Sequence, residues 1–299
     1  MYCLQRCCHH KRYLSKCLQR YSRHSSTQDG IKFHESENTS VPPDTNGEIS
    51  TQSQVPKSSD TNIPIFPLMK EPGFKKKDWN IAAKKSGRLP SVTKILQDTM
   101  PIQNAIMLLK WKQKMIAELG EKGFIKFNEE TLAAGSALHR CIQQYLQGIP
   151  MNEINVGKAN AGHWKSMASI LPQITDVYAT EKYVKHPMLS YAGYIDCIAT
   201  YKGKLCVIDW KTSTKPKPTL LKCYDSPLQT AAYTGATNFD DSINVQVVDT
   251  LLVIAYKNGT EAHVHYMPKK TSQYFWEKWL SRLHMYRLMK ASEKEALDI

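Results

Sequence analysis

The sequence predicts an α/β domain in which a mixed central sheet is flanked by helices and preceded by an N-terminal helical cap. Segments with helical and strand-like spacing follow one another in the order helices, strands, helix, strands, helix, which is typical of such a domain. The hydrophobic fraction of 41% is low for a fully packed chain, which indicates that part of the 299 residues lies outside the core. No apolar run approaches the ~18 residues of a membrane span.

The overall charge and the cysteines narrow the function classes. The net charge of +13 favours a polyanionic partner, although a basic solvent-exposed surface would give the same balance. Eight cysteines without a C-x-x-C pair, in a chain this long, predict reduced thiols and not a disulfide framework or a structural zinc site.

The N-terminal part is expected to lie outside the folded domain. Residues 1–28 contain six Lys or Arg and no acidic residue, which is typical of a mitochondrial targeting peptide; a basic arm that binds nucleic acid is the alternative. Residues 29–80 are rich in Ser, Thr, Asn and Pro and predict a disordered linker, in which the apolar stretch 63–69 could dock on the domain. The folded domain would then cover residues 81–299.

The domain is expected to open with two helices separated by Pro101, the second of them ending at Gly120. We expect helices over residues 91–100, 102–119, 129–146, 159–171, 226–238 and 271–290. We expect strands over residues 176–184, 189–201, 204–212, 245–257 and 261–267, with an Asn258-Gly259 turn joining the last two. The first two helices would form the cap above the sheet.

Two aspartates lie inside the most strand-like part of the chain. If Lys202-Gly203 is a two-residue hairpin turn, counting outward pairs Asp196 directly with Asp209, with their Cβ atoms ~5 Å apart. Lys211 is two residues beyond Asp209 and therefore shares its face. Adjacent carboxylates repel unless a cation lies between them, so this pattern predicts a divalent metal site beside a lysine. The alternative is that the aspartates mark strand ends and Lys211 is solvated.

Two helical pairs add to this pattern. His139 follows Gly135 by four residues on a predicted helix, where a glycine suggests close approach to another element. Gln229 and Tyr233 lie four residues apart on one face of another predicted helix. Each pair alone is compatible with an ordinary histidine or with a polar residue beside a packed aromatic ring.

The ordered set G-x-x-x-H, D, D-x-K and Q-x-x-x-Y resembles the RecB-like branch of the PD-(D/E)XK nuclease superfamily over roughly residues 89–289. The resemblance implies a nuclease-like mixed sheet. The implied metal ligands are His139, Asp196, Asp209 and the backbone carbonyl of Trp210, and the implied catalytic residues are Asp196, Asp209 and Lys211. Gln229 and Tyr233 would support the substrate and the wall of the active site.

One position departs from the superfamily's name, because Ile195 stands where a proline would precede the first aspartate. Glu181 on the preceding strand could also approach the site. Lys215 and Lys217 follow the catalytic strand, where they could bind the phosphate backbone of the substrate.

The resemblance and the basic leader together imply a metal-dependent single-stranded DNA exonuclease that hydrolyses phosphodiester bonds from free ends and flaps. It would use Mg²⁺, with Mn²⁺ as a substitute, and act as a monomer in the mitochondrial matrix, in the maintenance of mitochondrial DNA. The mitochondrial DNA replication machinery remains open as a protein partner, and no membrane is expected. Two alternatives remain: a catalytically inactive nucleic-acid-binding protein on the same fold, and a structure-specific endonuclease.

Overall fold

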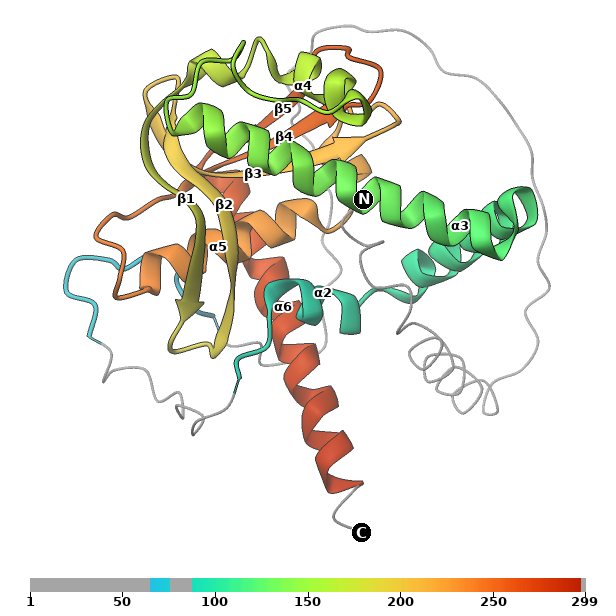
Figure 1. Cartoon of the computed structure of the whole chain (residues 1–299). Coiled ribbons are helices and arrows are strands. Elements are labelled where there is room, and N and C mark those ends of the chain that lie inside the picture. Colours follow the sequence, from blue (N-terminus) through green and yellow to red (C-terminus); the bar gives the residue numbers. More distant parts are fainter. Residues whose placement is uncertain (1–64, 76–87, 297–299) are drawn as a thin grey trace, which may run out of the picture.

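The computed structural model describes residues 65–75 and 88–296, and its centre is a five-stranded sheet (Figure 1). The strands, in their order across the sheet, are β1 (Ile174–His186), β2 (Tyr191–Tyr201), β3 (Lys204–Ser213), β4 (Asp249–Tyr256) and β5 (His263–Met267). β3 and β4 are parallel, whereas the other neighbours are antiparallel. The sheet is therefore mixed, as the sequence predicted.

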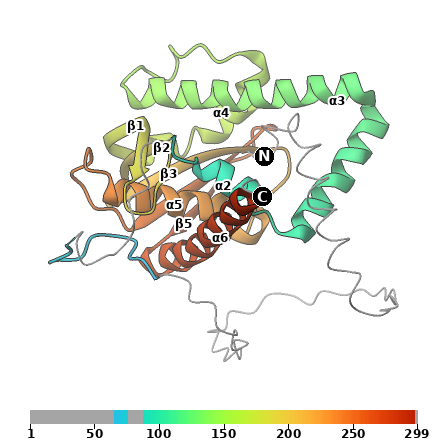
Figure 2. The same cartoon turned by 90° about the horizontal axis from the view of Figure 1, so that it is seen from below.

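Helices cover both faces of this sheet. The α-helices are α2 (Val92–Asp98), α3 (Ile102–Leu146), α4 (Ala161–Met167), α5 (Ser226–Phe239) and α6 (Lys269–Glu295). In the described residues, 3₁₀ turns cover Lys158–Asn160, Leu171–Gln173 and Leu220–Cys223. α3 and α4 lie on one face of the sheet and α2, α5 and α6 on the other (Figures 1 and 2). None of the helices in the described part of the chain is long and apolar enough to cross a bilayer.

The sheet is buried on both faces because each layer of helices closes its own hydrophobic core. On the side of α5 and α6, Val207 packs in a cluster with Trp276. On the side of α3 and α4, Ile208 packs in a cluster with Leu138. This double burial explains why β3 reads as an almost continuous apolar run.

The β2–β3 hairpin has the register that the sequence predicted. Tyr201 pairs with Lys204, and the pairing continues in step to Cys197 and Ile208. Lys202 and Gly203 both have positive φ, at 48° and 75°, as a type I′ turn requires.

The pair of β4 and β5 residues nearest their connecting loop is Ile254 with His263. The loop is therefore longer than the Asn258-Gly259 turn that the sequence predicted. Helix α4 holds this loop. The Oγ of Ser166 accepts a hydrogen bond from the backbone N–H of Tyr256 (2.9 Å), and the Ser166 carbonyl accepts one from Ala262 (2.9 Å). The loop thus packs against α4 instead of closing tightly on itself.

The long helix α3 is interrupted at Gly120 (φ 70°, ψ 166°), where the sequence predicted a helix end. It resumes at once, not near residue 129, because Phe124 returns to pack against Trp111 across the break (5.9 Å between ring centroids). The half of α3 before Gly120 extends away from the sheet (Figure 2). The preceding helix α2, expected in the cap, instead packs against α5 and α6.

Residues 65–75 lie against the domain. The side chains of Phe66 and Leu68 are 1% and 3% exposed. The indole of Trp276 donates a hydrogen bond to the Phe66 carbonyl (2.6 Å), and Asn238 donates one to the Leu68 carbonyl (2.9 Å). The apolar stretch therefore docks, while the boundary at residue 81 stays a prediction and the leader at 1–28 lies outside the described residues.

Candidate active site

The candidate site lies where the β2–β3 hairpin opens. Strand pairing ends at Cys197 and Ile208, one step before the two aspartates. Instead of a further ladder bond, the backbone N–H of Trp210 donates to Oδ2 of Asp196 (2.8 Å). The hairpin thus brings both carboxylates to the fork between the strands.

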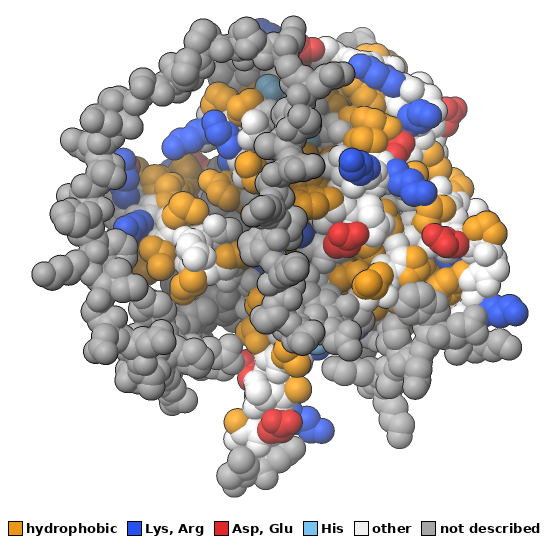
Figure 3. All heavy atoms as spheres, turned by 180° about the vertical axis from the view of Figure 1, so that it is seen from behind, with side chains coloured by type: hydrophobic (Ala, Val, Ile, Leu, Met, Phe, Trp, Pro, Cys, Tyr) orange, Lys and Arg blue, Asp and Glu red, His pale blue; other side chains and the backbone are white. Residues whose placement is uncertain are grey.

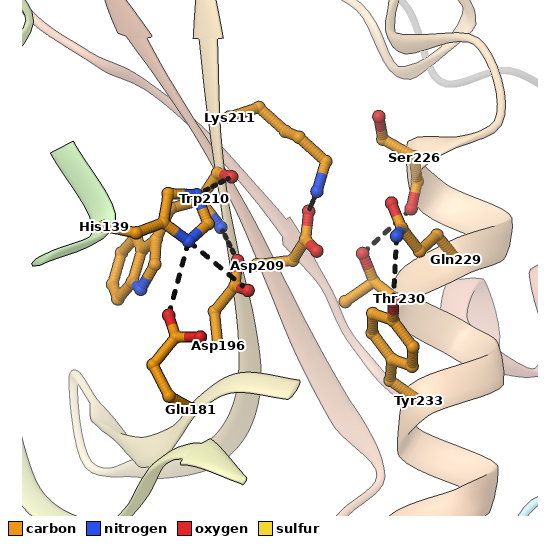
Figure 4. Close-up of polar contacts among 10 residues, drawn as sticks. All are labelled: His139, Glu181, Asp196, Asp209, Trp210, Lys211, Ser226, Gln229, Thr230 and Tyr233. Atoms are coloured by element: carbon orange, nitrogen blue, oxygen red, sulfur yellow. Dashed lines mark hydrogen bonds and ion pairs between the residues drawn. The ribbon is translucent and has the colours of Figure 1, made fainter. Parts of the chain in front are cut away.

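At Asp196 the regular alternation of β2 side chains between the two faces of the sheet is interrupted. Ile195 packs in the core on the α5 side, whereas Cys197 packs in the core on the α3 side. In a regular strand these two side chains would point to the same face. Beside this point on β1, Glu181 has a left-handed backbone (φ 45°). As a result, Asp196 and Glu181 both reach His139 of α3, while Asp209 points toward α5 (Figure 4).

His139, Glu181 and Asp196 form a cluster suited to a metal ion. Nδ1 of His139 is 3.4 Å from Oε1 of Glu181 and 3.5 Å from Oδ1 of Asp196, and one ligand atom from each residue lies within 4.8 Å of the others. Nε2 of His139 is 3.0 Å from the carbonyl oxygen of Trp210. Because that carbonyl can only accept, Nε2 carries the hydrogen and Nδ1 faces the carboxylates. A histidine fixed in this way by a backbone carbonyl is typical of metal ligands.

The charges of the cluster are strongly coupled. The pKa of Asp196 is raised to about 6, mainly by burial and also by the nearby Asp209, whereas His139 opposes the shift. Burial alone would lower the pKa of His139, but the negative charges of Asp196 and Glu181 outweigh it and the pKa is raised. Carboxylates buried in this way favour a positive charge between them, which a divalent cation would supply.

Asp209 and Lys211 form a second pair next to this cluster. Their side chains are 1% and 4% exposed, and the ammonium of Lys211 contacts Oδ2 of Asp209. Apart from Lys211, no hydrogen-bond donor among the described residues reaches a carboxylate oxygen of Asp209. This carboxylate therefore retains lone pairs for a further ligand beside the lysine.

Helix α5 forms the opposite wall of the site (Figure 4). The amide of Gln229 donates a hydrogen bond to the hydroxyl of Tyr233 (2.9 Å). Burial raises the pKa of Tyr233, and the charge of Asp209 adds to this effect. The ring of Tyr233 packs against Gly193 of β2, where there is no room for a side chain, because a Cβ atom there would lie 2.5 Å from Cε1 of Tyr233.

Several predicted residues occupy positions other than those expected. The Trp210 carbonyl, expected as a metal ligand, accepts the hydrogen bond of His139, and Glu181 faces Nδ1 together with Asp196. Lys217 donates to the carbonyl of Lys222 (2.8 Å), and burial lowers its pKa. The roles of Lys215 and Lys217 in binding phosphate stay predictions.

Glu181 and Gly193 were missed as principal site residues. The close approach at Gly193 follows from a tertiary contact that no local sequence pattern signals. At Gly135, where the sequence suggested a close approach, a Cβ would lie 4.0 Å from Oγ1 of Thr212 on β3, which is an ordinary contact distance and does not require a glycine.

The fold and the site define a nuclease-like α/β protein: a mixed sheet flanked by helices, with a buried D…D-x-K set beside a histidine and a second acid.

Comparison with known proteins identifies the family. Three curated relatives are each named mitochondrial genome maintenance exonuclease 1. The one from Xenopus tropicalis is 40% identical over 256 residues, which cover 82% of this chain and 74% of the relative. The Mus musculus relative is 44% identical over 200 residues (66% and 59%), and the Homo sapiens relative is 38% identical over 244 residues (81% and 66%). No protein-family model matches the chain. The chain belongs to the family of mitochondrial genome maintenance exonucleases.

Proposed function

We propose that this protein is a Mg²⁺-dependent exonuclease that hydrolyses single-stranded DNA from free ends and flaps in the mitochondrial matrix. Its family makes it a nuclease that acts in the maintenance of mitochondrial DNA. The metal, the strand preference and the compartment are the finer parts of the proposal. Mn²⁺ would substitute for Mg²⁺, because both take carboxylate ligands.

One observation carries the proposal: the His139–Glu181–Asp196 cluster lies beside the Asp209–Lys211 pair at the open end of one hairpin. A binding protein without turnover would have no need for this concentration of buried charge, which is costly to desolvate. The arrangement therefore favours an enzyme over an inactive DNA-binding protein.

Each side chain has a distinct role in this reaction. His139, Glu181 and Asp196 would hold a divalent cation, with Asp209 proposed as a further ligand, and the cation would activate water and offset negative charge on the phosphate. The Trp210 carbonyl keeps the ring of His139 in the orientation that presents Nδ1. Asp209 positions the ammonium of Lys211, which would orient the attacking water or stabilise negative charge on the phosphate.

Substrate would be attracted by the overall charge of +13. Lys and Arg side chains lie toward both edges of the face seen in Figure 3, among hydrophobic and some acidic side chains. The arm formed by α3 before Gly120 would restrict access from the side, so that a free single-stranded end enters most easily.

The deciding experiment compares end-labelled linear single strands, closed circular single strands, duplex and flap DNA, each with Mg²⁺, Mn²⁺ or EDTA at one fixed salt concentration. We expect cleavage of linear strands and flaps with metal, and none with EDTA. Rapid cutting of the circle would favour a structure-specific endonuclease instead.

The compartment is tested separately. A chain lacking residues 1–28 should keep nuclease activity in vitro and lose mitochondrial localisation in cells. Unchanged localisation would show that the basic leader is not the import signal.

A further inference from the structure

Two exposed tyrosines lie side by side near the metal-binding cluster and take no part in it. Tyr194 is the only exposed residue of β2, with 62% of its surface accessible. Tyr183 on β1 is 47% exposed, and the two rings meet edge to face with 5.3 Å between their centroids. Neither ring belongs to a hydrophobic cluster of the described residues. Their exposure therefore requires an explanation other than core packing.

The register of the strands connects this pair to the active site. Tyr183 pairs directly with Tyr194, and Lys182 pairs with Ile195 one step closer to the cluster. Glu181 and Asp196 are the next residues along the two strands. Residues two apart on a strand are separated by about 7 Å along it, so the tyrosine pair adjoins the carboxylates of the cluster.

The exposed face of β1 continues beyond the tyrosines. Glu181, Tyr183 and Lys185 are exposed, whereas Val184 and His186, which alternate with them, are buried on the α5 side. A carboxylate, an aromatic ring and an ammonium group thus follow one another along β1. This order matches a metal-bound phosphate, an unpaired base and a neighbouring phosphate of one nucleic-acid strand.

Tyr178, another exposed tyrosine of β1, has a structural role and serves for comparison. The hydroxyl of Tyr178 accepts a hydrogen bond from the backbone N–H of Asn244 (3.2 Å) and so ties β1 to the loop after α5. No hydrogen bond joins the hydroxyl of Tyr183 or Tyr194 to another of the described residues. The pair is therefore available to a ligand.

We propose that Tyr183 and Tyr194 form a stacking subsite for one unpaired base of the DNA strand whose phosphate lies at the catalytic cluster, with Lys185 contacting the adjacent phosphate. This inference rests on the proposed nuclease function. It names two residues that would make the enzyme prefer single-stranded to duplex DNA. A base in duplex is already stacked and paired, so only a single strand can present its face to these rings.

Binding is measured with a fluorescent single-stranded oligonucleotide at fixed salt, using the full chain with Asp209→Asn to prevent cleavage. Adding Tyr194→Ala should weaken binding on the order of ten- to a hundred-fold, because stacking of one base is lost. Tyr194→Phe keeps the ring and should bind like the parent. Tyr178→Ala is the matched control on the same strand and should bind normally. Equal binding by the Tyr194→Ala protein would overturn the proposal.

A scan with abasic sites makes the test specific to stacking. Oligonucleotides that lack one base at successive positions should bind the parent more weakly at a single position. The Tyr194→Ala protein should be insensitive at that position, and Tyr183→Ala provides an independent second variant. Equal sensitivity in parent and variants would refute the subsite, whereas absence of cleavage by the unmodified enzyme in any metal would refute the proposed function instead.

Discussion

The two halves of the β2–β3 hairpin have opposite characters. Next to the turn, the strands are paired from Tyr201–Lys204 to Cys197–Ile208, and the paired residues are largely buried. Beyond Cys197 and Ile208 the strands separate, β2 continuing along β1 and β3 along β4. The hairpin's own charged residues at the site, Asp196, Asp209 and Lys211, lie in this open half.

The difference shows how one hairpin provides both stability and chemistry. Regular pairing satisfies the backbone and leaves no space for a ligand between strands. Where pairing stops, backbone groups become available to side chains, as in the bond from Trp210 to Asp196. We therefore expect substitutions in the open half to change mainly catalysis and substitutions in the paired half to change mainly stability.

The largest expected effect comes from the open half. Asp209→Asn or Lys211→Ala should lower the single-turnover cleavage rate by about 10²–10³-fold or more, because in the proposed mechanism Lys211 acts on the reacting phosphate or its water and Asp209 positions Lys211. Asp196→Asn should behave in the same way. Cleavage is measured with linear single strands at saturating enzyme, and DNA binding by fluorescence anisotropy should persist. A wild-type rate for the Asp209 or Lys211 variant would place the active site elsewhere.

The paired half should respond in stability. Ile208, adjacent to Asp209, is fully buried between β2, β4 and the α3 side of the sheet. Ile208→Ala should lower the free energy of unfolding by about 2–5 kcal/mol, and Ile208→Val by about 0.5–1.5 kcal/mol. Denaturant unfolding measures this loss. The folded protein should cleave at a near-normal rate, and a rate loss as large as that of Lys211→Ala would break the distinction between the halves.

The paired half was also the part that the sequence could predict. The Lys202-Gly203 turn and the alternation of strand residues determine a register by counting, and this register is confirmed as far as Cys197 and Ile208. The direct pairing of Asp196 with Asp209 on one face, which the same counting predicted, is wrong, because the strands separate one step earlier. Glu181 could not be assigned in the same way, because its position depends on a left-handed φ and on the change of face at Asp196. Similarly, α3 resumes directly after Gly120 because Trp111 before the break packs against Phe124 after it.

A smaller effect should follow from filling the space at Gly193 in the open half. Gly193→Ala would place a methyl carbon 2.5 Å from the ring of Tyr233, so the ring must move and the bond from Gln229 must weaken. We expect a loss of about 1–3 kcal/mol in stability, together with slower cleavage. Gly157→Ala is the matched control, because its Cβ would meet no atom within 4 Å. Equal stability and equal cleavage rates of the two variants would show that Tyr233 does not form part of the active-site wall.

The smallest effect concerns the far end of the open half, where His186 of β1 pairs with Tyr191 of β2. The ring of His186 is fully buried and stacks on Phe239 (4.6 Å between centroids). Its Nδ1 accepts a hydrogen bond from the backbone N–H of Leu189 (3.1 Å). Burial lowers the pKa of His186 to about 3, and nearby positive charges add to the shift.

Because this pKa is lower in the folded than in the unfolded protein, where it is ~6.5, the unfolded chain binds the proton first as the pH falls. His186 should therefore reduce stability progressively below pH ~6.5 and reach its full effect only near pH 3. Between pH 7.5 and 5.5 the expected loss is about 1.4 kcal/mol. Urea unfolding at the two pH values measures it. His186→Phe keeps the aromatic shape and loses the acceptor for Leu189, so its stability should be lower at both pH values but should fall less between them. An equal fall in both proteins would mean that the histidine is not buried in its neutral form at this end of the open half.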